Sequence, residues 1–448
     1  MLNKHRALNI LFSQNTLFII VNLFVHAINF LRSFVFMRVL DLADLGMISL
    51  VQTCIMFIGF MHFGFFQGGY RIIAYKHDES DQVNNIVFSF LGCLGALLIV
   101  FALVFPIIGI DVIIGKQYLL LSVVAGIFTL ASTWLTNTMT VKKMIPEINQ
   151  ILTISGIISI VLIALVFVWG IFGGILSIMM QPVVFVTLAL LRCKELRPTA
   201  LCFSKKIIKS IIQLGFVPFC VGIFSILNIQ IERWSIAYLL NVEDLGRFYL
   251  VFVFSSLFVL IPTSTNYLFF PKIISAYEHG QLPEFYRQSR NYTLVLIAYG
   301  VVTLLVTLTL FQPIVDVLFP MHSENTKYVY MLLPGFICNL LYYSVSSILN
   351  AWRDFKSLLL SGSIGVAASV IIIFVTGKMG VFSLDTMVII KNISYILPML
   401  FGAVYIFEGG NLAASKIRNL ECPNYEICLI DYGCGKFNRK IHIMEQYP

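Results

Sequence analysis

Charged residues are scarce in this chain of 448 residues. Asp, Glu, Lys and Arg make up 12% of it, whereas soluble domains carry about 25%. Hydrophobic residues make up 59%, and the mean hydropathy is +0.91. A water-soluble core cannot hide this much apolar surface, so lipid must surround most of the chain. The composition excludes a soluble enzyme, a secreted disulfide-rich domain and a nucleic-acid-binding protein.

A paired cysteine framework is also lacking. Six of the nine cysteines lie in or beside apolar runs, where Cys acts as a small hydrophobic residue: Cys54, Cys93, Cys193, Cys202, Cys220 and Cys338. The other three, Cys422, Cys428 and Cys434, lie in the polar tail with five residues between neighbours. Zinc sites favour cysteines separated by two to four residues. We therefore expect reduced thiols, no metal site and no cofactor.

Catalytic motifs are missing as well. The sequence contains no Walker motif, no HExxH and no GxSxG. The loops expected on the outer side are all short, whereas a lipid-glycan polymerase needs an extended loop to hold its chemistry. We therefore expect no catalytic residues, and we expect that the protein is not an enzyme.

Long apolar runs are what the chain does contain. A membrane-spanning helix needs about 20 apolar residues, and twelve such runs are found: 14–36, 45–66, 85–109, 117–140, 149–170, 172–191, 213–235, 248–270, 291–312, 327–349, 357–377 and 386–407. Only Gly170–Gly174 separates the fifth run from the sixth. The pattern predicts an all-α polytopic membrane protein with about 12 transmembrane helices.

The basic residues indicate which side is cytoplasmic. With the N-terminus inside, 22 of the 30 basic residues fall in inner loops and tails, and five fall in outer loops. The remaining three, Arg32, Arg233 and Lys391, lie within predicted spans. This bias follows the positive-inside rule and explains the net charge of +8 without a nucleic-acid partner. Both termini are predicted to be cytoplasmic.

An internal repeat divides the chain. The segment Leu40–Gly46 (LDLADLG) reappears 200 residues later as Leu240–Gly246 (LNVEDLG), and Ile73–His77 is echoed by Ser275–His279 at an offset of 202. Six spans per half make the halves parallel repeats, as in alternating-access transporters. We expect two six-helix lobes around a central cavity. The boundaries are an N-terminal lobe at 1–191, a basic linker at 192–212 with a short amphipathic helix at 205–212, a C-terminal lobe at 213–407 and a tail at 408–448.

Polar side chains recur at helical spacing inside three of the spans. Such residues are costly in lipid and usually face a cavity or a partner. The candidate binding residues are Asn22, His26, Asn29 and Arg32 in the first span, Asn228, Glu232 and Arg233 in the seventh, and Asn339 and Tyr343 in the tenth. The alternative is that they join helices through hydrogen bonds and that Glu232 and Arg233 offset each other. Lys391 lies near a span end and can snorkel outward.

Several short motifs resemble the polysaccharide transporter family of the multidrug/oligosaccharidyl-lipid/polysaccharide exporter superfamily, which contains O-antigen and capsule-unit flippases. The resemblance covers roughly residues 10–407. It rests on an ordered set of motifs: Arg38-Val39-Leu40 with Asp44-Leu45-Gly46, Gly64 and Arg71, Leu214–Pro218, Glu232-Arg233, Leu245–Phe248 and Pro271-Lys272.

The resemblance implies a flippase in the bacterial inner membrane that moves an undecaprenyl-diphosphate-linked oligosaccharide from the cytoplasmic to the periplasmic leaflet. Its partners would be this lipid-linked substrate, membrane lipid and glycan polymerase machinery. Arginine side chains bind diphosphates bidentately, so Arg32 and Arg233 are the expected headgroup contacts. The main alternative is a cation-coupled multidrug antiporter of the same superfamily, although the first half has no acid inside a span. A major-facilitator symporter and a glycan polymerase are further alternatives.

Overall fold

The computed structural model describes residues 14–75, 77–104 and 114–419. The tail cysteines Cys422, Cys428 and Cys434, for which we expect reduced thiols, lie outside the described residues. The described chain forms one compact unit that ends at Ala403 and a second that begins at Val404. The last helix runs across this boundary, and the two lobes described below lie in the first unit.

Twelve helices in the described part are long and apolar enough to cross a membrane. Each of the twelve predicted runs overlaps one of them, and no strand occurs among the described residues, so the predicted all-α multi-pass membrane protein is confirmed. The helices are α2 (Gln14–Val39), α3 (Leu42–Gly59), α5 (Ser80–Val104), α6 (Lys116–Val141), α7 (Ile145–Ile163), α8 (Val166–Arg192), α9 (Lys205–Leu239), α11 (Tyr249–Glu278), α12 (Leu282–Val306), α14 (Thr326–Ala351), α15 (Phe355–Lys378) and α16 (Leu384–Asn419).

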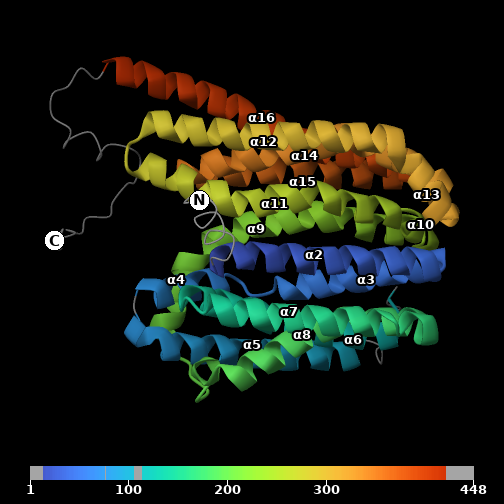
Figure 1. The fold of residues 1–448 in the computed structure, drawn as a ribbon, viewed down its shortest axis with the longest axis horizontal. Helices are drawn as coiled ribbons and strands as arrows, with labels where there is room; N and C mark the ends of the chain where they lie inside the picture. Colours follow the sequence, from blue (N-terminus) through green and yellow to red (C-terminus); the bar gives the residue numbers. More distant parts are fainter. Residues whose placement is uncertain (1–13, 76, 105–113, 420–448) are drawn as a thin grey trace, which may run out of the picture. The chain divides into compact units, whose positions relative to one another are not determined.

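The helices pack mainly with others from their own half of the chain. In the first half, α3 contacts α6, and α7 contacts α2 and α8; in the second, α11 contacts α12 and α14, and α9 contacts α15. Figure 1 shows α2–α8, in blue to green, on one side and α11, α12, α14 and α15, in yellow to orange, on the other. We call α2–α8 the N-terminal lobe, and α9–α16 up to Ala403 the C-terminal lobe.

Two helix ends differ from the sequence prediction. The second predicted run extends to residue 66, but α3 ends at Gly59 and the short helix α4 (Phe65–Tyr75) follows. Between them Phe63 and Gly64 have positive φ angles of 45° and 84°, a conformation that suits glycine. The division of the fifth and sixth runs also lies earlier than predicted, because α7 ends at Ile163. Gly170 still breaks the helical geometry inside α8, with φ 54° and ψ −132°.

Helix α9 is unusually long and joins the two lobes. The short helix predicted at 205–212 is continuous with the seventh span, and Pro218 lies inside the resulting 35-residue helix. A Cβ atom on Gly68 of α4 would lie 1.9 Å from the carbonyl oxygen of Ile211, and Ile211 is fully buried. The first turns of α9 therefore pack against α4, whereas later turns pack against α15.

The repeated segments begin corresponding helices and meet each other. Asp41 and Asn241 cap the N-termini of α3 and of the short helix α10 (Val242–Arg247), since each side chain accepts a hydrogen bond from the backbone N–H three residues on. The backbones of α3 and α10 are in contact. We call this place, formed by 40–46 and 240–247, the closed end.

Candidate functional site: a cavity between the lobes

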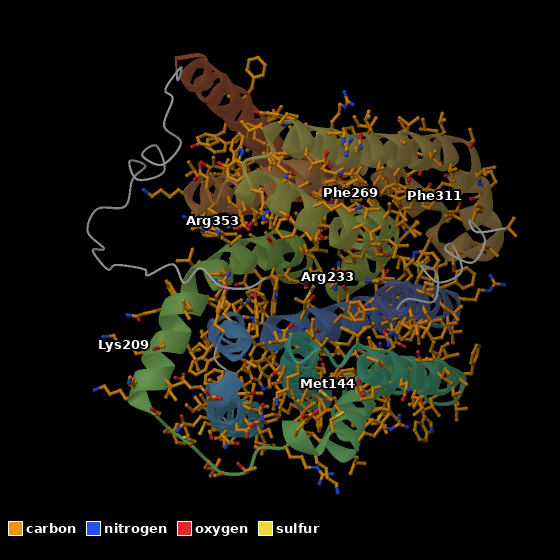
Figure 2. The ribbon with its side chains drawn as sticks, turned by 60° about the vertical axis from the view of Figure 1, so that its left-hand side comes forward. Met144, Lys209, Arg233, Phe269, Phe311 and Arg353 are labelled. Carbon is orange, nitrogen blue, oxygen red and sulfur yellow. The ribbon has the colours of Figure 1, made fainter. Side chains whose placement is uncertain are left out.

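A cavity of about 530 Å³ lies where the lobes face each other. Its walls come mostly from the C-terminal lobe, from α9, α11, α14, α15 and α16. The N-terminal lobe contributes His26 of α2 and Met56 of α3. Figure 2 shows Arg233 between Met144, which immediately precedes α7 in the N-terminal lobe, and the helices that carry Phe269 and Phe311 in the C-terminal lobe.

The cavity is blocked on one side by contacts between the lobes at the closed end. The rings of Phe34 and Phe319 meet edge to face with centroids 4.6 Å apart. Arg38 Nη1 donates a hydrogen bond of 3.0 Å to the carbonyl oxygen of Leu318. The cavity lining extends from Arg233, near the end of α9, to Asn350, near the opposite end of the molecule at the end of α14. Arg233 therefore lies at the floor of the cavity.

The structure brings most of the candidate binding residues together. Six of the nine line this cavity: His26, Asn228, Glu232, Arg233, Asn339 and Tyr343. Asn29 lines an adjoining cavity of about 380 Å³ that also includes His26 and Arg233. Polar side chains of α2, α9 and α14 therefore line adjoining cavities, and their role in binding stays a prediction.

Arg32 and Asn22 are not among the lining residues of either cavity. Arg32 is 7% exposed, and its guanidinium donates to Asn29 Oδ1 at 2.7 Å and to Ser159 Oγ and the carbonyl oxygen of Ser177, both at 3.3 Å. All of these acceptors belong to the N-terminal lobe. Asn22 Nδ2 donates to the carbonyl oxygen of Phe18. Arg32 lies on the side of α2 that faces α7 and α8. Arg233, in contrast, lines both cavities.

The guanidinium of Arg233 has a buried nitrogen without a hydrogen-bond acceptor and forms no ion pair among the described residues. Its Cζ atom lies 4.3 Å from the centroid of the Phe252 ring, a favourable cation–π contact. Its Nε is buried and has no hydrogen-bond acceptor among the described residues. No carboxylate in the described part of the chain lies within ion-pair distance of it. Because a buried donor without an acceptor is costly, this side chain is suited to an anionic ligand.

Glu232 forms its ion pair with Lys391 and not with Arg233. Glu232 Oε2 lies 3.3 Å from Lys391 Nζ, and the two residues are 5% and 2% exposed. Lys391 also donates to the carbonyl oxygen of Asn228 at 2.5 Å and lies 4.6 Å from the centroid of the Tyr395 ring. The expectation that Lys391 snorkels outward is wrong. Sequence reasoning missed this pair because 159 positions separate its members and no local pattern joins them.

Two buried acceptors near the cavity floor also lack donors. Asn228 Oδ1 and Gln230 Oε1 are buried without a hydrogen-bond partner, and both residues line the cavity. Sequence reasoning missed Gln230 because it does not share the helical spacing of Asn228 and Glu232. Together with Tyr343 and Asn339, these groups offer hydrogen bonds to ligand hydroxyls. Within the described ranges no three His, Cys, Asp or Glu residues gather as a metal site, and the six cysteines found there are free thiols.

Comparison with known proteins identifies the fold. No protein-family model matches the sequence, and no curated protein matches it. Among solved structures, the inward-facing conformation of a multidrug resistance MATE family transporter of the MOP superfamily superposes with a TM-score of 0.72 and 12% identity, covering 89% of this chain and 96% of that one. The lipid II flippase MurJ, in an inward closed conformation, gives a TM-score of 0.65 at 15% identity, covering 88% and 87%.

The outward-facing conformation of a multidrug resistance MATE family transporter gives a TM-score of 0.60 at 13% identity, covering 92% of this chain and 98% of that one. At these identities the likeness establishes the fold alone, which is that of MOP-superfamily membrane transporters. The predicted fold class is therefore confirmed, whereas membership of the superfamily stays a prediction.

Proposed function

We propose that this chain is an alternating-access flippase for an undecaprenyl-diphosphate-linked oligosaccharide, such as an O-antigen or capsule repeat unit. The observation that carries the proposal is the buried guanidinium Nε of Arg233 at the cavity floor, which has no hydrogen-bond acceptor among the described residues. A diphosphate is anionic and accepts the two parallel hydrogen bonds that a guanidinium donates. Binding the headgroup there would provide the acceptor that Arg233 lacks.

The remaining lining suits the glycan. Hydroxyl groups can donate to Asn228 Oδ1 and Gln230 Oε1, which are buried without donors. Asn339 and Tyr343 offer further hydrogen bonds from α14. A cavity of about 530 Å³ also falls within the range of roughly 300–1,000 Å³ that is usual for ligand sites.

The adjoining cavity offers a passage for the lipid tail. It lies between α2 and α11, and apolar side chains such as Leu23, Phe30 and Leu257 line it. Arg233 belongs to the walls of both cavities. A substrate could therefore place its diphosphate at Arg233 while its tail extends between the lobes into the bilayer.

Membrane orientation follows from the distribution of basic residues. The positive-inside bias places both termini in the cytoplasm, and the closed end then faces the periplasm of a bacterial inner membrane. The cavity would be open to cytoplasmic substrate in this conformation. Transfer would require the closed end to separate, after which glycan polymerase machinery could receive the product.

The competing function is a cation-coupled drug antiporter. The MATE transporters among the structural neighbours are multidrug transporters, whereas MurJ is a lipid II flippase. The charge of the cavity favours an anionic lipid-linked cargo over a cationic drug. Its one carboxylate among the described lining residues, Glu232, is paired with Lys391, which leaves Arg233 positive and disfavours a cationic drug.

The test is transport by purified protein in liposomes. An undecaprenyl-diphosphate-linked oligosaccharide is loaded, and its movement is followed with an external glycan-modifying enzyme. We expect Arg233→Ala to slow flipping roughly 10–100-fold, since hydrogen bonds to charged groups contribute about 1.5–3 kcal/mol. Arg353→Ala is the matched control, because Arg353 is exposed and pairs with Glu278 away from the cavity. Wild-type protein that moves a cationic dye under a proton gradient but no lipid would favour the antiporter.

A further inference from the structure

Three charged side chains lie at the cavity floor, and they are divided into a pair and a single charge. Glu232 and Arg233 are consecutive in α9, so their side chains leave the helix in different directions. Glu232 faces α16, where Lys391 lies 3.3 Å away. Arg233 faces α11, where Phe252 lies under its guanidinium. Together the three groups carry a net charge of +1.

Glu232 lines the cavity, whereas Lys391 is not among the lining residues and is 2% exposed. The lysine therefore lies behind the carboxylate and does not face the ligand space. Its ammonium group is further held by the carbonyl oxygen of Asn228 and by the Tyr395 ring. These contacts hold the ammonium beside the carboxylate of Glu232.

We propose that Lys391 is a positioning residue that neutralises Glu232 and thereby leaves Arg233 free to bind an anionic headgroup. The inference rests on the proposed function, because it assumes an anionic ligand at Arg233. In a site of low dielectric constant, charges on consecutive residues interact strongly. Without Lys391, the carboxylate of Glu232 would offset the charge of Arg233, and the floor of the cavity would become neutral.

The arrangement predicts a specific order of anion affinities. Removing the lysine leaves one acid and one arginine, so anion binding falls. Removing both members of the ion pair leaves Arg233 alone, so anion binding returns. Removing only the acid leaves two cations, so anion binding is at least as tight as in the wild type. A purely structural ion pair would also be rescued in the double variant, because removing both partners leaves no unpaired buried charge. It would not, however, keep Glu232→Gln at or above the wild-type affinity, because that variant leaves the buried lysine unpaired.

The experiment measures binding of farnesyl diphosphate to the full-length protein in lipid nanodiscs by calorimetry. We expect Lys391→Met to weaken binding about tenfold and Lys391→Met/Glu232→Gln to restore it to within about threefold of wild type. Glu232→Gln alone should bind no more weakly than wild type. Lys327→Met is the matched control, because Lys327 pairs with Asp385 at 3.8 Å on an exposed surface, and we expect it to bind as wild type.

The inference is overturned if Lys391→Met binds as tightly as wild type, or if the double variant stays as weak as Lys391→Met. The second result would mean that Lys391 contacts the ligand itself or only supports the fold. Should Lys391→Met fail to fold, Glu232→Gln decides, since only this inference predicts binding at least as tight as in the wild type when the acid alone is removed, and weaker binding overturns it. Wild-type protein that binds no farnesyl diphosphate also overturns it. The liposome assay judges the transported lipid separately, so failure of the proposed function is distinguishable.

Discussion

Gly46 and Gly246 hold equivalent places in the two repeats, and each lies against the backbone of the other lobe. A Cβ atom on Gly46 would lie 1.8 Å from the carbonyl oxygen of Val242, and one on Gly246 would lie 1.7 Å from that of Leu42. The contact is reciprocal, because Leu42 and Val242 are themselves repeat partners. Only glycine allows the lobes to approach this closely, so these two residues permit the closed end to form.

We predict that Gly46→Val or Gly246→Val shifts the protein away from the closed-end conformation. Overpacking costs about 1–3 kcal/mol, which corresponds to a roughly 5- to 150-fold shift in population. Distances between spin labels on α3 and α10 should lengthen, and flipping should slow. Gly92→Val is the control, because a Cβ atom there meets nothing within 4 Å. Unchanged label distances in the Gly46 and Gly246 variants would contradict the assignment.

We predict that Arg32 stabilises the N-terminal lobe and does not bind the substrate. Arg32→Met removes the hydrogen bonds to Asn29, Ser159 and Ser177, and we expect a loss of about 1–3 kcal/mol of stability. Thermal unfolding in detergent should begin at a lower temperature, while the affinity for farnesyl diphosphate stays at the wild-type value. Lost affinity in a variant of normal stability would return Arg32 to the binding site.

A second stability prediction concerns the buried amide of Asn84. Its Oδ1 accepts a 2.9 Å hydrogen bond from Trp134 Nε1, and its Nδ2 donates at 3.1 Å to the carbonyl oxygen of Leu196. Asn84→Leu leaves both partners unsatisfied, at about 1–3 kcal/mol for each. We expect Asn84→Leu to unfold at a lower temperature than the control variant Thr133→Val, which changes an exposed residue of α6. Equal unfolding temperatures would mean that the amide bridge contributes nothing.

The thiol of Cys193 should alkylate slowly near neutral pH. Burial raises the pKa of Cys193 above its usual range, and the nearby carboxylates of Glu147 and Glu195 raise it further, while Arg192 acts in the opposite direction. Since the thiolate is the nucleophile, a raised pKa means less thiolate at a given pH. The alkylation rate of the folded protein should keep rising with pH beyond the pH at which the rate of an unfolded control levels off. Glu195→Gln should speed the reaction, and a rate that levels off where the unfolded control does would contradict the prediction.

The sequence predicted the spans well because lipid imposes one length and one composition on every crossing segment. It failed where the outcome depends on packing between distant segments. The break after Gly59 accompanies a close approach of Gly64 to Gly215, which hydropathy does not record. Both Arg32 and Arg233 were expected to contact the headgroup, but their neighbours differ. Lys391 was assigned outward because its partner, Glu232, could be found only in three dimensions.

The packing of α9 on α4 has a consequence for how the lobes stay together. Gly215 contacts the backbone of Gly64, and Arg71 Nη1 donates a 3.1 Å hydrogen bond to the carbonyl oxygen of Leu214. These contacts do not depend on the peptide chain that connects α8 to α9. In a protein cut between Pro198 and Phe203, the two fragments should therefore assemble as subunits of a heterodimer do, with the first turns of α9 as the recognition element.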